Sequence, residues 1–164
     1  MKTMQFIAAY ALLMGAGSSF AHGNVSHSPA DASAPSIKEQ KAWGIAGEAR
    51  EVLRTITLNM TDDMRFAPGH FSVKRGETLR LRVVNQGQLM HELVLGTQAS
   101  LDEHARLMLK YPGMEHAEPY MAHVAPGKSE DLIWSFNRTG QFDFACLIAG
   151  HYQAGMTGRF TVTD

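Results

Sequence analysis

Apolar and polar residues alternate in short segments over most of the chain after Val52. Alternation with a period of two is typical of strands that bury one face, and turn residues such as Pro68-Gly69 and Thr139-Gly140 separate the segments. The predicted strands are Val52–Met60, Met64–Pro68, His70–Lys74, Thr78–Asn85, His91–Leu95, His123–Ala125, Asp131–Phe136, Gln141–Cys146 and Thr157–Thr163. The pattern therefore predicts an all-β fold, an antiparallel β-sandwich or barrel.

One segment departs from the strand pattern and predicts a helical insert. Over Ala99–Lys110 the apolar residues recur at helical spacing, namely Leu101, Ala105, Met108 and Leu109. The following Tyr111-Pro112-Gly113 ends the helix, because proline lacks a backbone donor and glycine favours turns. The expected fold is therefore all-β with one short helix.

The beginning of the chain has the character of a secretory signal peptide. A lysine near the start precedes an apolar run from Phe6 to Ala16, and small residues precede a cleavage point after Ala21. The run is shorter than the roughly 20 residues that cross a membrane, and no later segment is apolar enough to do so. We expect residues 1–21 to be removed and the mature chain to be exported to a bacterial periplasm, without an integral membrane segment.

The remaining chain divides into two predicted parts. Residues 22–51 begin with a stretch rich in Ser, Ala and Pro, which predicts a flexible N-terminal tail and lead-in, and residues 52–164 form the folded domain. The formal net charge is −1 at pH 7, so the sequence offers no electrostatic basis for binding nucleic acid or an anionic membrane. The expected partners are a metal ion and a redox protein.

The candidate chemistry centres on Cys146, the single cysteine of the chain. An exported protein with one cysteine has no internal disulfide, and metal ligation is one reason to keep a free thiol there. His151 and Met156 follow Cys146 at successive five-residue steps, so one loop presents three donors. His91, at the start of a predicted strand, is the candidate fourth ligand.

This donor set predicts one copper ion per chain. Thiolate and thioether favour Cu(I), imidazole serves both oxidation states, and two His with one Cys and a weak Met form the ligand set of blue-copper electron-transfer sites. Two structural alternatives stay open, because free cysteine often packs as a small hydrophobe and methionine often fills a core. On these alternatives Cys146 and Met156 would be core residues.

A second group of soft donors suggests another copper site. His104 and Met108 lie four residues apart on the predicted helix, and Met114 and His116 follow in a turn-rich segment that continues to His123. Such a Met/His grouping suits Cu(I). The alternative is that Met108 packs inward and the histidines are solvated.

The mature N-terminus is a further candidate for copper binding. Cleavage after Ala21 would leave His22 as the first residue, with a free amine and an imidazole that together chelate copper. His27 lies close by in the same tail.

The pattern G-x-F-x-F-x-C-x4-H-x4-M over Gly140–Met156, with His91-Glu92-Leu93-Val94-Leu95 upstream, resembles the cupredoxin family. The resemblance covers about Val52 to Asp164 and implies a Greek-key sandwich with a type 1 copper site. Within the family, the chain resembles periplasmic cupredoxins linked to copper tolerance. Azurin- and plastocyanin-like members usually carry Asn where this chain has Glu92, and that Asn ties the two ligand loops together. The sequence therefore leaves the rigidity of the loops, and a blue or green colour, open.

Enzyme classes find little support in the sequence. Multicopper oxidases and copper nitrite reductases need further coppers, and a binuclear centre needs a second cysteine. A hydrolase built on Cys146 and His151 would leave Met156 unexplained, and the thioether argues against structural zinc.

Two binding functions remain. One is a factor that binds, buffers or oxidises Cu(I) in copper tolerance, and the other is a dedicated electron carrier. A carrier would dock its redox partner on an apolar patch near His151, to which four residues could contribute: Met90, Ile148, Ala149 and Ala154.

Overall fold

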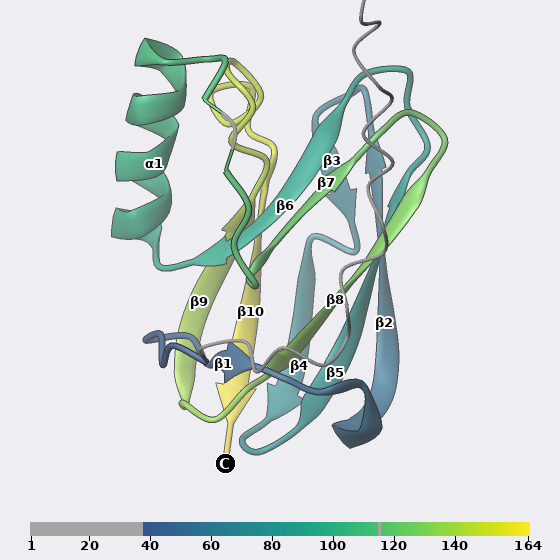
Figure 1. Cartoon of the computed structure of the whole chain (residues 1–164), viewed down its shortest axis with the longest axis vertical. Helices are drawn as coiled ribbons and strands as arrows, with labels where there is room; N and C mark the ends of the chain where they lie inside the picture. Colours follow the sequence, from purple (N-terminus) through teal and green to yellow (C-terminus); the bar gives the residue numbers. More distant parts are fainter. Residues whose placement is uncertain (1–37, 115) are drawn as a thin grey trace, which may run out of the picture. The chain divides into compact units, whose positions relative to one another are not determined.

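The computed structural model describes residues 38–114 and 116–164, and within them two five-stranded sheets pack face to face (Figure 1). The first sheet has the order β1 (Ile45–Ala46), β8 (Ser129–Ser135), β5 (Thr78–Asn85), β2 (Val52–Thr61) and β3 (Arg65–Ala67). The second has the order β4 (His70–Lys74), β10 (Thr157–Thr163), β9 (Gly140–Ala145), β6 (His91–Gly96) and β7 (Met121–Val124). The predicted β-sandwich is confirmed. The predicted signal peptide, His22 and His27 lie outside the described residues.

The sheets are mixed, whereas the sequence pattern predicts antiparallel pairing. β2 pairs with β5 in parallel, and β4 pairs with β10 in parallel, while the other pairings are antiparallel. The reason is that β2 and β5 are separated in the chain by β3 and β4, so no hairpin joins them. A period of two identifies a strand but carries no information about the direction of its neighbour.

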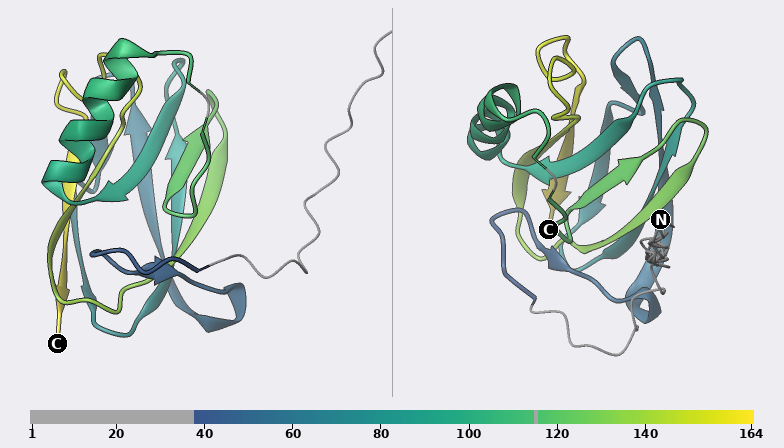
Figure 2. Two further views of the ribbon diagram at one scale, coloured as in Figure 1. Left: turned by 60° about the vertical axis from the view of Figure 1, so that its left-hand side comes forward. Right: turned by 45° about the horizontal axis from the view of Figure 1, so that its top comes forward.

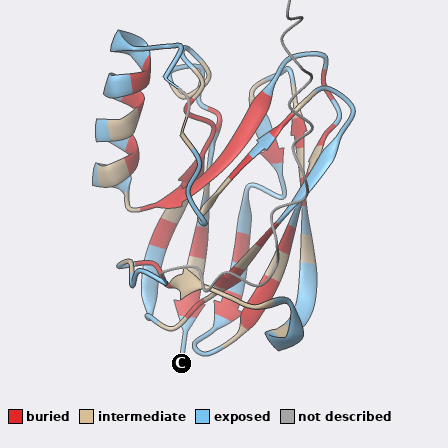
Figure 3. Cartoon of the chain, in the orientation of Figure 1, coloured by how far each residue is buried: buried red, intermediate tan, exposed pale blue. Residues whose placement is uncertain are grey.

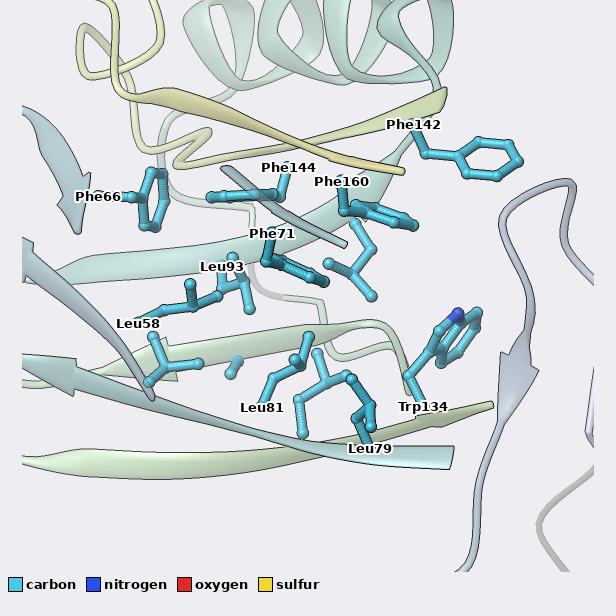
Figure 4. Close-up of a cluster of buried hydrophobic side chains, with 14 of the residues drawn as sticks. Leu58, Phe66, Phe71, Leu79, Leu81, Leu93, Trp134, Phe142, Phe144 and Phe160 are labelled. Atoms are coloured by element: carbon cyan, nitrogen blue, oxygen red, sulfur yellow. The ribbon is translucent and has the colours of Figure 1, made fainter. Parts of the chain in front are cut away.

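The core between the sheets is filled by leucine and aromatic side chains (Figure 4). The Phe71 ring stacks on Phe160 with a centroid separation of 5.4 Å and on Phe144 at 5.6 Å. From the opposite sheet, Leu81 and Leu58 are fully buried against this aromatic group. Burial of these large side chains is the main term that stabilises the sandwich.

The helix α1 (Gln98–Lys110) covers the outer face of the second sheet and begins one residue before the predicted segment. The Thr97 hydroxyl accepts a hydrogen bond of 3.2 Å from the Ser100 amide, which satisfies one free donor of the first turn. The buried stripe of α1 packs on β6 and β9 in a small cluster of Val94, Leu101, Ala105, Met108, Ala145 and Leu147. As a result, all six residues of β6 are buried (Figure 3).

Residues 38–51, within the predicted flexible lead-in, pack on the sandwich. β1 pairs with β8, a 3-10 turn (Ala49–Glu51) leads into β2, and the Trp134 indole donates a 2.9 Å hydrogen bond to the Trp43 carbonyl. Gly44 has φ +132°, and a Cβ there would collide with the Trp134 indole and the Ser135 carbonyl. The alternation pattern begins only at Val52, so it did not reveal this contact.

The fold brings together the ends of segments that are distant in sequence. The start of β6 and the end of β9 lie at the same end of the sandwich (Figure 1). The turn that follows β2 lies at this end too (Figure 1). The described part of the chain contains no helix long and apolar enough to cross a membrane.

The aromatic core makes a first prediction. We expect Phe160→Ala to lower the free energy of unfolding by about 3–5 kcal/mol, because the fully buried ring contacts Phe71, Phe136 and Phe142 and its removal leaves a cavity. Leu53→Ala is the matched control, since this leucine is 69% exposed and its loss should change stability by less than about 0.5 kcal/mol. Urea unfolding of the metal-free protein measures both. Equal effects would contradict this account of the core.

Candidate metal centre

Cys146 directly follows β9 and starts a tightly turned loop that returns to β10. The Cys146 amide donates to the Met156 carbonyl at 3.0 Å, and the Met156 amide donates to the His151 carbonyl at 3.1 Å. The His151 amide in turn donates to Ile148 at 2.9 Å. These backbone hydrogen bonds hold the three predicted donors of the loop close to one another.

His91 reaches the same place from the start of β6. The donor atoms of His91, Cys146 and His151 all lie within 4.8 Å of one another, and these residues form the single group of this kind among residues 38–114 and 116–164. The Cys146 Sγ is 3.3 Å from His151 Nδ1, and the two imidazole rings are 5.0 Å apart between centroids. The structure therefore brings together three of the four residues predicted as ligands.

Met156, the fourth predicted ligand, lies next to Cys146, because its backbone carbonyl accepts the hydrogen bond from the Cys146 amide. Its side chain is fully buried in the same core cluster as Cys146. Burial is compatible with both roles considered for this methionine, as a weak copper ligand and as a core residue.

The protonation of the site is shaped by burial. Burial raises the pKa of the Cys146 thiol to about 12, so at neutral pH the metal-free protein holds a thiol whose proton a metal must displace. Burial, with a smaller contribution from His91, lowers the pKa of His151, which favours the neutral imidazole that binds metals. A thiol with a raised pKa is a poor nucleophile, which argues against the hydrolase alternative.

Asp62, in the turn between β2 and β3, contacts a predicted ligand although the sequence did not point to it. Its carboxylate accepts hydrogen bonds from the amides of Gln88 at 2.7 Å and Leu89 at 3.2 Å, and the Gln88 bond is the main reason that its pKa is lowered. Its Oδ1 lies 3.0 Å from His91 Nε2. Nothing in the sequence links Asp62 to a histidine in a different strand.

The contact with Asp62 determines which His91 nitrogen is free. Nε2 is engaged by the carboxylate, whereas the buried Nδ1 has no hydrogen-bond partner within the described residues. A buried polar atom without a partner is costly, and a metal ion would satisfy it. Two imidazoles, a thiol and a nearby thioether fit copper.

Glu92 ties the two ligand-bearing segments together. Its fully buried carboxylate accepts a 2.8 Å hydrogen bond from the Leu147 amide, and its own amide donates to Cys146 Sγ at 3.4 Å. Burial is the main cause of a raised pKa for this carboxyl group. Glu92 therefore connects the two ligand-bearing segments although it replaces the usual Asn. The sequence had left this connection open.

The second predicted group of donors is also drawn together. The His104 and His116 rings are 4.6 Å apart between centroids, while Met108, Met114 and His116 line one cavity beside the metal centre. His123, at the end of that predicted segment, and Glu92, which was not part of the prediction, line the same cavity.

Comparison with known proteins agrees with this geometry. The family model described as copper binding proteins, plastocyanin/azurin family, matches residues 53–163. A copper-resistant cuproprotein CopI from Rubrivivax gelatinosus is 44% identical over 136 residues, which cover 83% of this chain and 82% of the relative. A protein of the same name from Pseudomonas aeruginosa is 34% identical, with 74% of this chain and 83% of the relative covered.

Solved structures share the architecture. Auracyanin B matches with a TM-score of 0.61 and 21% identity over 74% of this chain and 95% of its own. Reduced auracyanin from Roseiflexus castenholzii matches with a TM-score of 0.60 and 20% identity over 69% of this chain and 99% of its own. At such identity the likeness concerns the fold alone. The family match, the sandwich fold and the His-Cys-His cluster together lead to one conclusion: the chain belongs to the plastocyanin/azurin family of copper-binding proteins.

Proposed function

We propose that this protein binds copper in the periplasm and thereby contributes to copper tolerance. The observation that carries the proposal is the 44% identity to a copper-resistant cuproprotein over four fifths of both chains. The predicted signal peptide and the single free cysteine support an exported metal protein. The His-Cys-His group among the described residues supports metal binding.

For the ligands, we propose His91, Cys146, His151 and Met156. The clustering of the first three donor atoms supports this set, and the burial of Met156 next to Cys146 supports the fourth. Bound copper supplies one-electron chemistry between Cu(I) and Cu(II). The chain buries His91, Cys146 and Met156. Asp62 orients His91, and Glu92 joins β6 to the loop after Cys146.

A second candidate function, electron transfer to a redox protein, is favoured by the surface at this end. Leu89 and Met90, immediately before His91, are each 47% exposed. Exposed apolar residues beside a redox centre suit transient docking of a partner. If cells need the protein to tolerate copper, the first role is favoured. If they do not, electron transfer is favoured.

Cys146→Ser tests the metal centre directly. The wild-type protein with Cu(II) is expected to show a visible thiolate-to-copper charge-transfer band, and the variant is expected to lose it because an alcohol is not a thiolate donor. Visible absorption during Cu(II) titration measures the band. A folded, copper-loaded wild-type sample without the band would contradict the ligand assignment.

Asp62→Ala tests the orienting contact. Loss of a partner that orients a metal-bound histidine typically lowers metal affinity about 10-fold to 100-fold, so we expect weaker copper binding with the charge-transfer band retained. Asp63→Ala is the matched control, because this exposed neighbour hydrogen-bonds to Thr61 rather than to His91. Competition with a chelator of known affinity measures both, and equal affinities for the two variants would refute the role.

Growth under copper stress tests the biological role. In a strain that lacks the gene and has become copper-sensitive, the wild-type chain should restore growth and Cys146→Ser should not. Growth across a series of copper concentrations is the measurement, with exported protein quantified in each strain. Full rescue by Cys146→Ser would show that tolerance does not depend on this centre.

A further inference from the structure

A cavity of about 700 Å³ lies beside the metal centre, between α1 and β7. Figure 2 shows the connection that leaves the C-terminal end of α1 and returns to the start of β7. Potential metal donors dominate the lining: Met90, Met108, Met114, His116, His123 and Glu92. The proposed type 1 site does not use any of them as a ligand.

The three thioethers come from three different segments. Met108 is buried on α1, whereas Met90 and Met114 are 47% and 41% exposed. Thioether sulfur is a ligand for Cu(I) and a poor one for Zn²⁺ or other hard ions. Convergence of three methionines on one cavity therefore indicates a soft cation.

Histidines add borderline donors to the same place. The His116 ring is 4.6 Å from that of His104 and 6.0 Å from that of His123, measured between centroids. His116 Nε2 is buried and has no hydrogen-bond partner within the described residues. Burial, and then the proximity of His116 and His123, lowers the pKa of His104, which favours a neutral imidazole at neutral pH.

Glu92 links this cavity to the metal centre. One carboxylate oxygen accepts from the Leu147 amide, next to Cys146, and the other lies 2.9 Å from His123 Nε2. Glu92 is fully buried, and it is among the residues that line the cavity. Burial of a carboxylate is unfavourable, and a cation in the cavity would add to the two contacts that Glu92 already makes.

We propose that this cavity is a second copper site, which takes Cu(I) through His116, His123 and the thioether of Met114. Its donor atoms are less tightly gathered than those of His91, Cys146 and His151, and its methionine ligand is exposed. The site is therefore open and exchanges its ion with solution, in contrast to the buried first site. The assignment rests on the cavity alone and does not require the proposed role in tolerance.

The test is an anaerobic Cu(I) titration of the mature chain against a chromophoric Cu(I) chelator. The double variant His116→Ala, His123→Ala should bind one equivalent of Cu(I) less than the wild type. In a separate sample, the metal-free double variant loaded with one equivalent of Cu(II) should still show the charge-transfer band. Cys146→Ser should instead lose the band and retain the second equivalent. The two sites are thereby distinguished.

Two single variants sharpen the result. Met114→Leu keeps the approximate size of an exposed side chain but removes the sulfur. It should lower the affinity of the second site for Cu(I) about 10-fold without changing the stability of the fold. His70→Asn is the matched control, because His70 lies in β4 outside the cavity and should leave the stoichiometry unchanged.

Three outcomes would overturn the proposal. An unchanged stoichiometry in the double variant would show that the cavity does not bind Cu(I). Loss of the second equivalent on replacing His22 and His27 instead would place the ion on the N-terminal segment. Displacement of the second Cu(I) by equimolar Zn²⁺ would show that the site does not select a soft ion.

Discussion

The buried hydrogen bond from the Leu147 amide to the Glu92 carboxylate holds the functional end of this protein together. It joins two segments 55 residues apart, one carrying His91 and the other carrying Cys146. Breaking a buried polar contact of this kind typically costs about 1–3 kcal/mol, because the group left behind has lost its hydration. The separation between the two ligand segments is therefore set by an interaction that solvent does not easily replace.

The rest of the sandwich keeps this contact dry. α1 covers one face of β6 and the opposite sheet covers the other, so Glu92 and His91 are both fully buried although they are polar. Cys146 is buried with them, and the same burial that excludes water raises the pKa of its thiol. Asp62 then engages one nitrogen of His91 and leaves the other free. The two ligand-bearing segments are therefore held in place by hydrogen bonds that involve Glu92 and Asp62.

Glu92 also lies between two environments, the buried core around Cys146 and the more open methionine-lined cavity. On one side its backbone contacts Cys146 Sγ inside the core, and on the other its carboxylate faces His123 and the methionine-lined cavity. An asparagine at this position would have a shorter side chain and no carboxyl group beside that cavity. Glu92 thus keeps the tie between the loops and adds carboxyl oxygens to the lining of the cavity.

The sequence by itself determined the β-sandwich, the helical insert and the family of copper proteins. Strand alternation depends on which face is buried, and the Cys146, His151 and Met156 loop is a local pattern, so both are visible in one dimension. Only the tertiary structure decided the parallel pairings of β2 and β4, the packing of Trp43 on Trp134, and the contact between Asp62 and His91. Each of these joins residues that are far apart in the chain, and no local spacing encodes such a contact. Glu92 combines the two cases, because the sequence showed an unusual residue and the fold alone showed that its carboxylate reaches both Leu147 and His123.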